Sequence, residues 1–339
     1  MDNNILEIDT CVIGAGVSGL FISSKFLSIQ KKVLLVEESI VVGGQINLYK
    51  EKMIYNIPLI KNIKSNDVKE NLFNEIQDNE NLSLHMHSSV VDITKNDDKF
   101  IVNIIDKTTK KETKYICKYV VIASGKGIQK PNKLQIDGCE KFESKTLLYS
   151  IDNKEIFKGK NVVLAGGGDS IIDWSCELVD IVKSITVLHR RQIERLENPQ
   201  FLKFKKLCEY KRILTKIPYS ILKLNGEDGA IKDIEISNNE TGEEENLKCD
   251  YLLPFYGLKT TQKNLDLYEK LGVKVSNNGI VVNSRNNQTS AENIFAVGDC
   301  CCFDGKISNI VMGFNDCLRC FYEICSLEHG KVDFYGHSK

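Results

Sequence analysis

Three glycines, at positions 14, 16 and 19, form the first part of this 339-residue sequence that could do chemistry, because they complete a G-x-G-x-x-G pattern. Between a strand and a helix, such a turn lets the backbone approach a pyrophosphate at the helix N-terminus. Glu37 ends the next apolar run, where a carboxylate can accept hydrogen bonds from the ribose hydroxyls of adenosine. Gly14, Gly16, Gly19 and Glu37 therefore predict a site for an adenine dinucleotide without a phosphate on that ribose.

A second glycine turn contains Gly166 and Gly168, but Ile171 stands where the third glycine is expected. The helix and strand must therefore pack differently there. As many positions separate Gly14 from Glu37 as separate Gly166 from the start of a basic triplet. The triplet consists of His189, Arg190 and Arg191. A guanidinium binds a phosphate through paired charged hydrogen bonds, so the triplet predicts NADPH rather than NADH. The alternative is an ordinary solvated loop.

The third stretch is CLRC, which places Cys317 and Cys320 at the spacing of a redox-active dithiol. A cysteine near a helix N-terminus has a lowered pKa, and we expect the last helix to start close to this pair. The alternative is two core residues on one helix face, since this chain uses cysteine freely. A third cysteine group, residues 300–302, alternates in direction on an extended chain and suits no tetrahedral metal site, so we predict no metal.

The elements that must position these residues occur twice. Residues 7–39 and 160–191 each indicate a strand, a glycine turn, a helix and a second strand. Short alternating runs with polar turns follow each unit, at 90–116 and 221–250, and predict β-meanders. The expected fold is α/β, with two Rossmann-like, three-layer dinucleotide-binding domains.

The end of the chain does not begin a third copy. Residues 289–306 predict a strand that closes the first domain's sheet, followed by a helix near 314–326. We therefore expect a discontinuous first dinucleotide-binding domain, residues 1–120 with 252–339, and an NADPH-binding domain, residues 121–251.

Composition favours a small-molecule function. The 45 basic and 46 acidic residues give a net charge of −1, which argues against a nucleic-acid or anionic-membrane partner. Apolar runs are too short to span a bilayer, and the N-terminus lacks a signal-peptide pattern, so we expect a cytoplasmic protein. Twelve cysteines without regular spacing are expected to be mostly buried. The basic stretch at 201–212 predicts either a partner-docking patch, an NADPH contact or a wet helix face with core aromatics.

Over nearly its whole length the sequence resembles the thioredoxin-reductase-like flavoproteins, and within them the ferredoxin-NADP(+) reductases of that structural class. The stretches that carry the resemblance are CVIGAGVSGL, VGGQINLYKEKMIYNIP, VVIASG, VVLAGGGDSIIDW, VLHRR, FYG, TSAENIFAVGD and the terminal GHS. The resemblance implies FAD and NADP(H) as cofactors, a homodimer, and ferredoxin or a similar small iron-sulfur protein as partner.

The resemblance also implies roles for single residues in the flavin site. Gly44, Gln45 and Tyr49 would lie along the flavin, and Asp299 would accept hydrogen bonds from its ribityl chain. A helix after Gly313 would direct its N-terminus at the flavin N1 and C2 oxygen. The catalytic site would be completed on the two ring faces, by Tyr49 and by His337 of the partner's C-terminal tail. The alternatives are that Tyr49 is an ordinary interface tyrosine and that His337 is simply a disordered residue of the tail.

The NADPH site implied by the resemblance consists of the second turn with the two residues after it and the basic triplet: Gly166, Gly168, Asp169, Ser170, His189, Arg190 and Arg191. Thioredoxin reductases carry a dithiol shortly before this turn, but residues 146–163 contain no cysteine. The leading hypothesis is therefore a ferredoxin-NADP(+) reductase that needs no general acid or base. The alternatives are a disulfide reductase using Cys317 and Cys320, and a non-catalytic nucleotide sensor.

Overall fold

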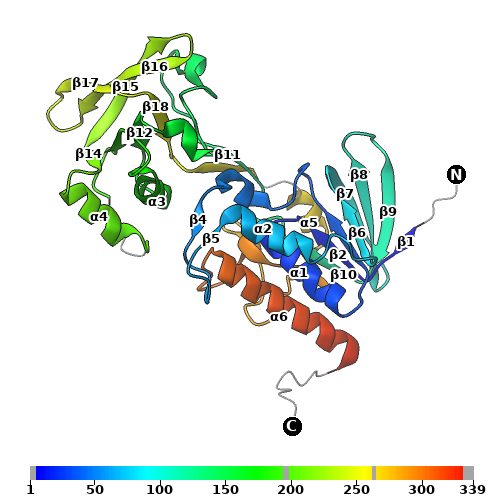
Figure 1. Cartoon of the computed structure of the whole chain (residues 1–339). Coiled ribbons are helices and arrows are strands. Elements are labelled where there is room, and N and C mark those ends of the chain that lie inside the picture. The colour runs from blue at the N-terminus through cyan, green and yellow to red at the C-terminus, as the bar shows by residue number, and fades with distance from the viewer. Residues whose placement is uncertain (1–4, 194–197, 262–264, 331–339) are drawn as a thin grey trace. The chain divides into compact units, whose positions relative to one another are not determined.

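The computed structural model describes residues 5–193, 198–261 and 265–330 (Figure 1). The chain forms two compact units, which we describe separately. Unit 1 consists of Met1–Asn47, Asn56–Ile128 and Thr260–Lys339, and unit 2 of Leu48–Tyr55 and Gln129–Lys259.

A five-stranded parallel sheet forms the centre of unit 1. Its inner strands are fully buried apolar runs, as expected for a parallel sheet covered on both faces. In order across the sheet the strands are β22 (Ile294–Ala296), β10 (Tyr119–Ile122), β2 (Thr10–Ile13), β3 (Val33–Val36) and β6 (Leu82–His85). The edge position of β22 confirms the prediction that the stretch at 289–306 closes this sheet.

Two further sheets complete unit 1. The larger contains the predicted meander, in which β8 pairs antiparallel with β7 and β9. Its order is β1 (Leu6–Glu7), β9 (Glu112–Cys117), β8 (Lys99–Asp106) and β7 (Ser88–Asn96). The smaller contains β20 (Val275–Ser276), β21 (Gly279–Val281) and β23 (Cys301–Cys302).

The helices of unit 1 are α1 (Val17–Ser28), α2 (Ser65–Asn74), α5 (Leu265–Lys270), α6 (Ile310–His329) and the 3-10 turn η4 (Gly298–Cys300). Among them, α1 packs on the parallel sheet, α2 and α6 pack on α1, and α5 packs on the meander sheet. The rings of Phe21 and Phe314 lie 4.5 Å apart between α1 and α6, and those of Phe26 and Phe321 lie 5.5 Å apart. These pairs fix α6 beside the helix of the first glycine turn.

The last helix starts earlier and ends later than the predicted 314–326. Asn309 accepts a hydrogen bond from the Met312 N–H at 2.7 Å and so caps the helix at this point. Gly313 therefore lies in the first turn of α6 rather than before it. Cys317 lies about two turns inside the helix, so the prediction of a cysteine pair at the helix start was wrong.

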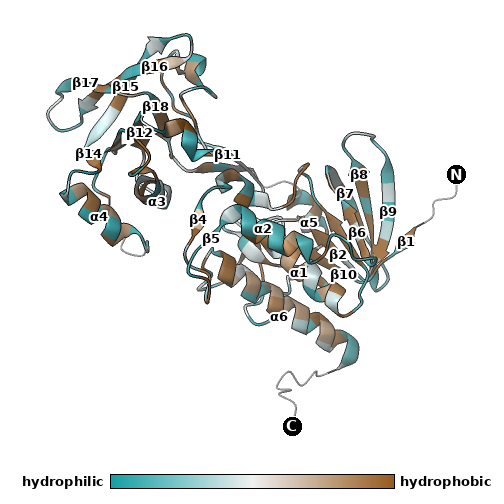
Figure 2. Cartoon of the chain, in the orientation of Figure 1, coloured by the Kyte–Doolittle hydropathy of each residue, from teal (hydrophilic) through white to brown (hydrophobic). Residues whose placement is uncertain are grey.

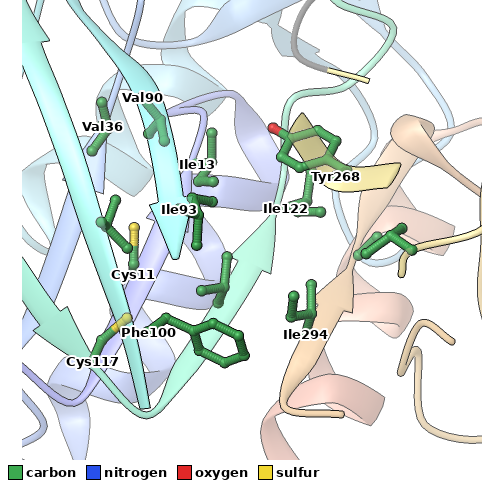
Figure 3. Close-up of a cluster of buried hydrophobic side chains, with 14 of the residues drawn as sticks. Cys11, Ile13, Val36, Val90, Ile93, Phe100, Cys117, Ile122, Tyr268 and Ile294 are labelled. Atoms are coloured by element: carbon green, nitrogen blue, oxygen red, sulfur yellow. The ribbon is translucent and has the colours of Figure 1, made fainter. Parts of the chain in front are cut away.

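One core of unit 1 lies between the parallel sheet and the meander sheet (Figure 3). Its buried side chains include Cys11, Ile13, Val36, Val90, Ile93, Phe100, Cys117, Ile122, Tyr268 and Ile294. Burial raises the pKa of the Cys117 thiol to about 12, and it raises that of Cys11 well above its ordinary value. These two cysteines therefore behave as small apolar residues, as predicted for most cysteines of the chain.

Unit 2 repeats the same plan with a four-stranded parallel sheet and a three-stranded antiparallel one. The parallel sheet consists of β14 (Leu214–Lys216), β13 (Ser184–Leu188), β12 (Asn161–Ala165) and β18 (Tyr251–Pro254). The second predicted meander consists of β15 (Tyr219–Glu227), β16 (Ala230–Asn238) and β17 (Glu244–Lys248). Its helical elements are α3 (Asp169–Leu178), α4 (Phe201–Glu209), η2 (Cys139–Phe142) and η3 (Lys154–Phe157). The α/β fold with two dinucleotide-binding domains is thus confirmed.

The remaining short elements lie near the chain crossings from one unit to the other. They are η1 (Gly44–Tyr49), β4 (Met53–Ile54), β5 (Ile63–Lys64), β11 (Ile128–Pro131) and β19 (Leu258–Thr261). Residues 121–128 group with unit 1, because β10 belongs to its sheet, and residues 252–259 group with unit 2, because β18 pairs with β12. Within the described ranges, every helix is too short or too polar to span a bilayer.

Candidate functional site

The first glycine turn joins β2 to α1 and requires glycine at two places. Gly14 has a φ of +104°, and a Cβ there would lie 2.6 Å from the carbonyl oxygen of Ala123. A Cβ on Gly19 would lie 1.8 Å from the carbonyl oxygen of Gly14. By contrast, the nearest described atom to a Cβ on Gly16 is the Cα of Gly44, at 4.0 Å. Gly16 caps α1 without a side-chain hydrogen bond, so free space adjoins the helix start where a pyrophosphate would bind.

Glu37, just after β3, lies against this turn. Its Oε2 accepts a hydrogen bond from the Ala15 N–H at 2.7 Å, and its Oε1 accepts one from the Ser39 N–H at 2.8 Å. Burial raises the pKa of this carboxyl group, against the lowering effect of the two backbone hydrogen bonds. The turn and the predicted ribose-binding carboxylate therefore form one hydrogen-bonded unit.

Asp299 lies half-buried in η4, and this turn also approaches α1. A Cβ on Gly298 would lie 2.5 Å from the Ser18 Oγ, and one on Gly313 of α6 would lie 2.8 Å from the same atom. The N-terminal ends of α1 and α6 and the turn carrying Asp299 therefore meet around Ser18. The structure thus brings Asp299 and the start of α6 to the same end of α1 that carries the first glycine turn.

Of the other residues predicted for the flavin site, one lies at the first glycine turn. Gly44, with a φ of +56°, lies against Gly16, since its Cβ would be 3.1 Å from the Gly16 Cα. Gln45 is exposed. Tyr49 belongs to the segment 48–55, which groups with unit 2, and burial raises the pKa of its hydroxyl. His337 lies outside the residues that the structure describes.

The second glycine turn joins β12 to α3 in unit 2. Gly166 has a φ of +141°, and a Cβ there would lie 2.5 Å from the Phe255 carbonyl oxygen. Its Cβ would also lie 3.5 Å from the Ile171 Cδ1, and Ile171 is fully buried. The helix here thus packs through an apolar side chain instead of a third glycine. Gly168 caps α3 without a side-chain hydrogen bond, and no described atom lies within 4 Å of where its Cβ would be.

The basic triplet follows β13 and lies beside the second turn. A Cβ on Gly167 would lie 2.4 Å from the His189 Nε2, so this imidazole packs against the glycine turn. Arg190 and Arg191 are exposed. Burial raises the pKa of Tyr256, and the charge of Arg190 opposes that shift, which places this guanidinium near the FYG segment. The structure thus brings His189 to the turn and leaves both arginines open to solvent.

Asp169 and Ser170 begin α3 directly after the turn. The Asp169 Oδ1 accepts a hydrogen bond from the Asn198 Nδ2 at 3.2 Å, and Asn198 also donates to the Asp173 Oδ1 at 3.1 Å. Sequence reasoning missed this role of Asn198, because the contact joins segments that are far apart in the chain. Asn198 bridges the Asp169 and Asp173 carboxylates, so the first carboxylate of α3 already has a hydrogen-bond partner.

Both CLRC cysteines are fully buried in unit 1. The Cys317 Sγ donates a hydrogen bond to the Ser18 carbonyl oxygen at 3.3 Å. Burial raises the pKa of both thiols well above the ordinary value, which disfavours the nucleophilic thiolate. The environment of Cys317 and Cys320 is therefore that of core residues.

The basic stretch at 201–212 includes α4, along which Figure 2 shows many hydrophilic residues. Phe201 and Phe204 are buried in the core of unit 2, and Lys205 and Lys206 are exposed. Of the three interpretations, this pattern matches the solvated helix face with core aromatics. In the described ranges no group of three or more His, Cys, Asp or Glu side chains could hold a metal ion.

Sequence reasoning missed three residues around the first site. Ser18 was only a variable position of the glycine pattern, Gly298 only part of AVGD, and Asp316 an isolated acid in the last helix. The small size of Ser18 and Gly298 is a signal of close approach. Nothing in the sequence indicated that Asp316 is fully buried and accepts a hydrogen bond from the Gly298 N–H at 3.2 Å.

The model of the pyridine nucleotide-disulphide oxidoreductase family matches residues 8–316 of the chain. A relative named ferredoxin–NADP reductase from Orientia tsutsugamushi (strain Boryong) is 34% identical over 339 residues, which cover 100% of this chain and 97% of the relative. A relative of the same name from Wolbachia sp. subsp. Brugia malayi (strain TRS) is 32% identical over 337 residues, covering 98% and 97%.

Solved structures of thioredoxin reductases share the fold. The enzyme from T. acidophilum superposes with a TM-score of 0.74 at 20% identity, covering 95% of this chain and 99% of that one. The Lactococcus lactis enzyme, in its FR conformation, gives a TM-score of 0.73 at 21% identity, covering 94% and 98%. At these identities the likeness concerns the fold alone.

Proposed function

The chain belongs to the pyridine nucleotide-disulphide oxidoreductase family, and we propose that this oxidoreductase is an FAD-dependent ferredoxin-NADP(+) reductase. Membership of the family implies FAD and NADP(H) as its cofactors. The identity of the one-electron partner is the part that the proposal adds.

One observation carries the proposal most directly: two glycine turns of the same design are followed by groups of opposite charge. Glu37 lies beside the first turn, and His189 with the exposed Arg190 and Arg191 follows the second. A carboxylate repels a 2′-phosphate, whereas guanidinium groups bind it. This supports FAD in unit 1 and NADPH in unit 2.

The residues of unit 1 fit FAD. Gly16 leaves space above an uncapped helix start for a pyrophosphate, and the Glu37 carboxylate is held beside it for the ribose hydroxyls. Asp299 would accept hydrogen bonds from the ribityl chain, and α6 would direct its positive end toward the reduced ring. FAD, when bound, supplies the exchange between a two-electron hydride carrier and one-electron carriers.

The residues of unit 2 fit NADPH in the same way. Gly168 leaves space at an uncapped start of α3, and Ser170 offers a hydroxyl in its first turn. His189, packed on Gly167, would fix the entry of the basic loop, and Arg190 and Arg191 would hold the 2′-phosphate. Asp169 lies in the same first turn, with its carboxylate bonded to Asn198.

A disulfide reductase needs an accessible thiolate, and the described cysteines of unit 2 do not form a pair near its glycine turn. They are Cys139, Cys176, Cys208 and Cys249. Cys317 and Cys320 of unit 1 are buried thiols with raised pKa values. A one-electron acceptor such as ferredoxin needs no such pair, which favours it over a disulfide substrate.

Three finer assignments complete the proposal. Tyr49 and His337 would cover the two faces of the flavin ring, His337 from the partner subunit of a homodimer. The protein would act in the cytoplasm, which agrees with free cysteines throughout the described part of the chain. A mass in solution equal to one chain of 38.3 kDa would contradict the homodimer.

The proposal is tested by anaerobic titration of the FAD-loaded protein with NADPH, followed by addition of oxidised ferredoxin. We expect NADPH to bleach the flavin absorbance and ferredoxin to restore it. A Cys317→Ala/Cys320→Ala variant should do both at the wild-type rate, because neither thiol takes part.

Three other outcomes of this titration would contradict the proposal, and each points to a different alternative. A protein that binds both nucleotides but is never bleached would be a nucleotide sensor. A double variant that is bleached by NADPH but transfers no electrons onward, with FAD still bound, would favour the dithiol enzyme. Wild-type bleaching without reoxidation by ferredoxin would exclude ferredoxin as the acceptor.

A further inference from the structure

A buried ion cluster lies behind the proposed flavin site of unit 1. Asp316 of α6 is fully buried, and its carboxylate pairs with two cations. Lys306, only 8% exposed, contacts Oδ2, and the Arg319 Nη2 lies 2.6 Å from Oδ1. A buried carboxylate is costly unless it is paired and hydrogen-bonded, and apolar residues would often be as stable. Fold stability alone therefore does not explain why Asp316, Lys306 and Arg319 form a charged cluster at this place.

The Asp316 carboxylate also bonds the turn that carries Asp299. Its Oδ2 accepts a hydrogen bond from the Gly298 N–H at 3.2 Å. On the other side of this residue, the Cys301 Sγ donates to the Gly298 carbonyl oxygen at 3.1 Å. The Cys301 backbone N–H also donates to this carbonyl oxygen, so both backbone polar groups of Gly298 are held directly before Asp299.

Arg319 extends the cluster to the preceding strand. Its Nε donates to the Asn287 Oδ1 at 3.0 Å, and the Asn287 Nδ2 donates to the Ala296 carbonyl oxygen at 3.0 Å. Ala296 is the last residue of β22. The cluster therefore anchors the chain at both ends of the short connection from β22 to η4.

The same connection packs against the start of α1 with little room for adjustment. Gly298 and Gly313 both approach the Ser18 Oγ so closely that a Cβ on either would lie within 2.8 Å of it. A displacement of η4 would therefore push against Ser18 and move the first turn of α1, where the pyrophosphate is expected to bind. The ion cluster lies within α6 and the loop before it, on residues that the proposed function does not use.

We propose that Asp316, paired with Lys306 and Arg319, is a positioning residue for the flavin site, which it controls by fixing Gly298 and hence Asp299. The inference rests on the proposed binding of FAD by unit 1. Asp316 does not touch the cofactor; it holds the backbone that presents Asp299 and sets the spacing between η4 and α1.

Two matched double variants separate positioning from stability. Asp316→Asn/Lys306→Met removes both charges but keeps an oxygen that can accept the Gly298 N–H. Asp316→Leu/Lys306→Met removes the same charges and that oxygen. The stability of each apo variant is measured by urea unfolding, and the FAD Kd by the quenching of FAD fluorescence. If the Leu variant does not fold, Asp316→Ala/Lys306→Met removes the same oxygen without added volume.

We expect the Asn variant to bind FAD within a few-fold of the wild type, and the Leu variant about tenfold more weakly, the loss typical of one buried hydrogen bond. The visible spectrum of bound FAD should shift only in the Leu variant. Equal FAD Kd values for the two variants, whatever their stabilities, would overturn the positioning role alone. A wild-type protein that binds no FAD would overturn the proposed function together with it.

Discussion

Glu37 combines two opposed influences within one side chain. Burial raises its pKa above the ordinary 4.5, and the Ser39 and Ala15 N–H groups act in the lowering direction. The backbone hydrogen bonds of the turn thus orient the carboxylate, while burial disfavours its ionised form. Because only the ionised form accepts hydrogen bonds from both ribose hydroxyls, cofactor affinity and charge are linked at this residue.

This link predicts a pH dependence that Glu37→Gln should remove. Since the folded pKa is raised, the carboxylate gains its proton at a higher pH than an exposed Glu. We expect the FAD affinity of the wild type to fall by about tenfold or more as the pH falls through that pKa. The variant should bind FAD weakly at every pH, as measured by fluorescence titration.

The stability of the apo protein should change in the opposite direction. A raised folded pKa means that protonation favours the folded state, so the wild type should gain stability relative to Glu37→Gln as the pH falls. The exposed Glu209→Gln serves as control and should show neither effect. Parallel pH curves for wild type and Glu37→Gln would exclude the carboxylate from the site.

The two glycine-turn helices solve the same packing problem differently. In α1, Gly19 lets the helix cross the Gly14 carbonyl so closely that no Cβ fits. In α3, the Ile171 side chain fills the corresponding place and joins the core of unit 2. A missing third glycine therefore does not disable the second turn, because an apolar side chain replaces the close backbone contact.

Substitutions of Gly16 and Gly19 in the first turn should consequently affect different properties, cofactor affinity in one case and stability in the other. In Gly19→Ala the new methyl group would clash with the Gly14 carbonyl oxygen and force α1 away from the turn. This variant should lower the free energy of unfolding by about 2 kcal/mol or more. Gly16→Ala has an ordinary φ of −71° and free space, so its stability should stay within about 1 kcal/mol of the wild type. Its methyl group would nevertheless enter the expected pyrophosphate space.

Urea unfolding of the apo proteins and FAD titration distinguish the two effects. We expect Gly16→Ala to keep its fold and lose at least tenfold in FAD affinity. Wild-type affinity in Gly16→Ala would show that the pyrophosphate does not bind at the start of α1.

The whole molecule is built from two copies of one nucleotide-binding plan with different charges at equivalent positions. If each unit selects its own cofactor, removing charge from unit 2 must leave unit 1 unaffected. Arg190→Ala/Arg191→Ala should raise the KM for NADPH by about 10- to 100-fold and change the KM for NADH little, since only NADPH carries the 2′-phosphate.

The same variant should bind FAD with unchanged affinity. Arg212→Ala, which removes an exposed arginine paired with Asp180 in the same unit, is the matched control and should change neither KM. Equal effects of the Arg190→Ala/Arg191→Ala variant on NADPH and NADH would contradict a 2′-phosphate contact.

Much of this molecule could be predicted from short-range patterns. Glycine spacing, the residue at the end of the following strand and the two meanders depend on local backbone geometry and periodicity, which a sequence shows directly. These patterns indicated both nucleotide-binding units and the closing strand β22. They also identified Glu37, which the structure places against its turn.

The tertiary structure decided what lies around those turns. CLRC looked like a dithiol near a helix start, but Asn309 caps α6 earlier in the chain, and the interior of unit 1 buries both thiols. Ser18 meets Gly298 and Gly313 from distant parts of the chain, and Asp316 joins η4 to α6. The sequence by itself determined which nucleotide-binding motifs are present, because each is local; only the packing of distant segments decided which side chains support them.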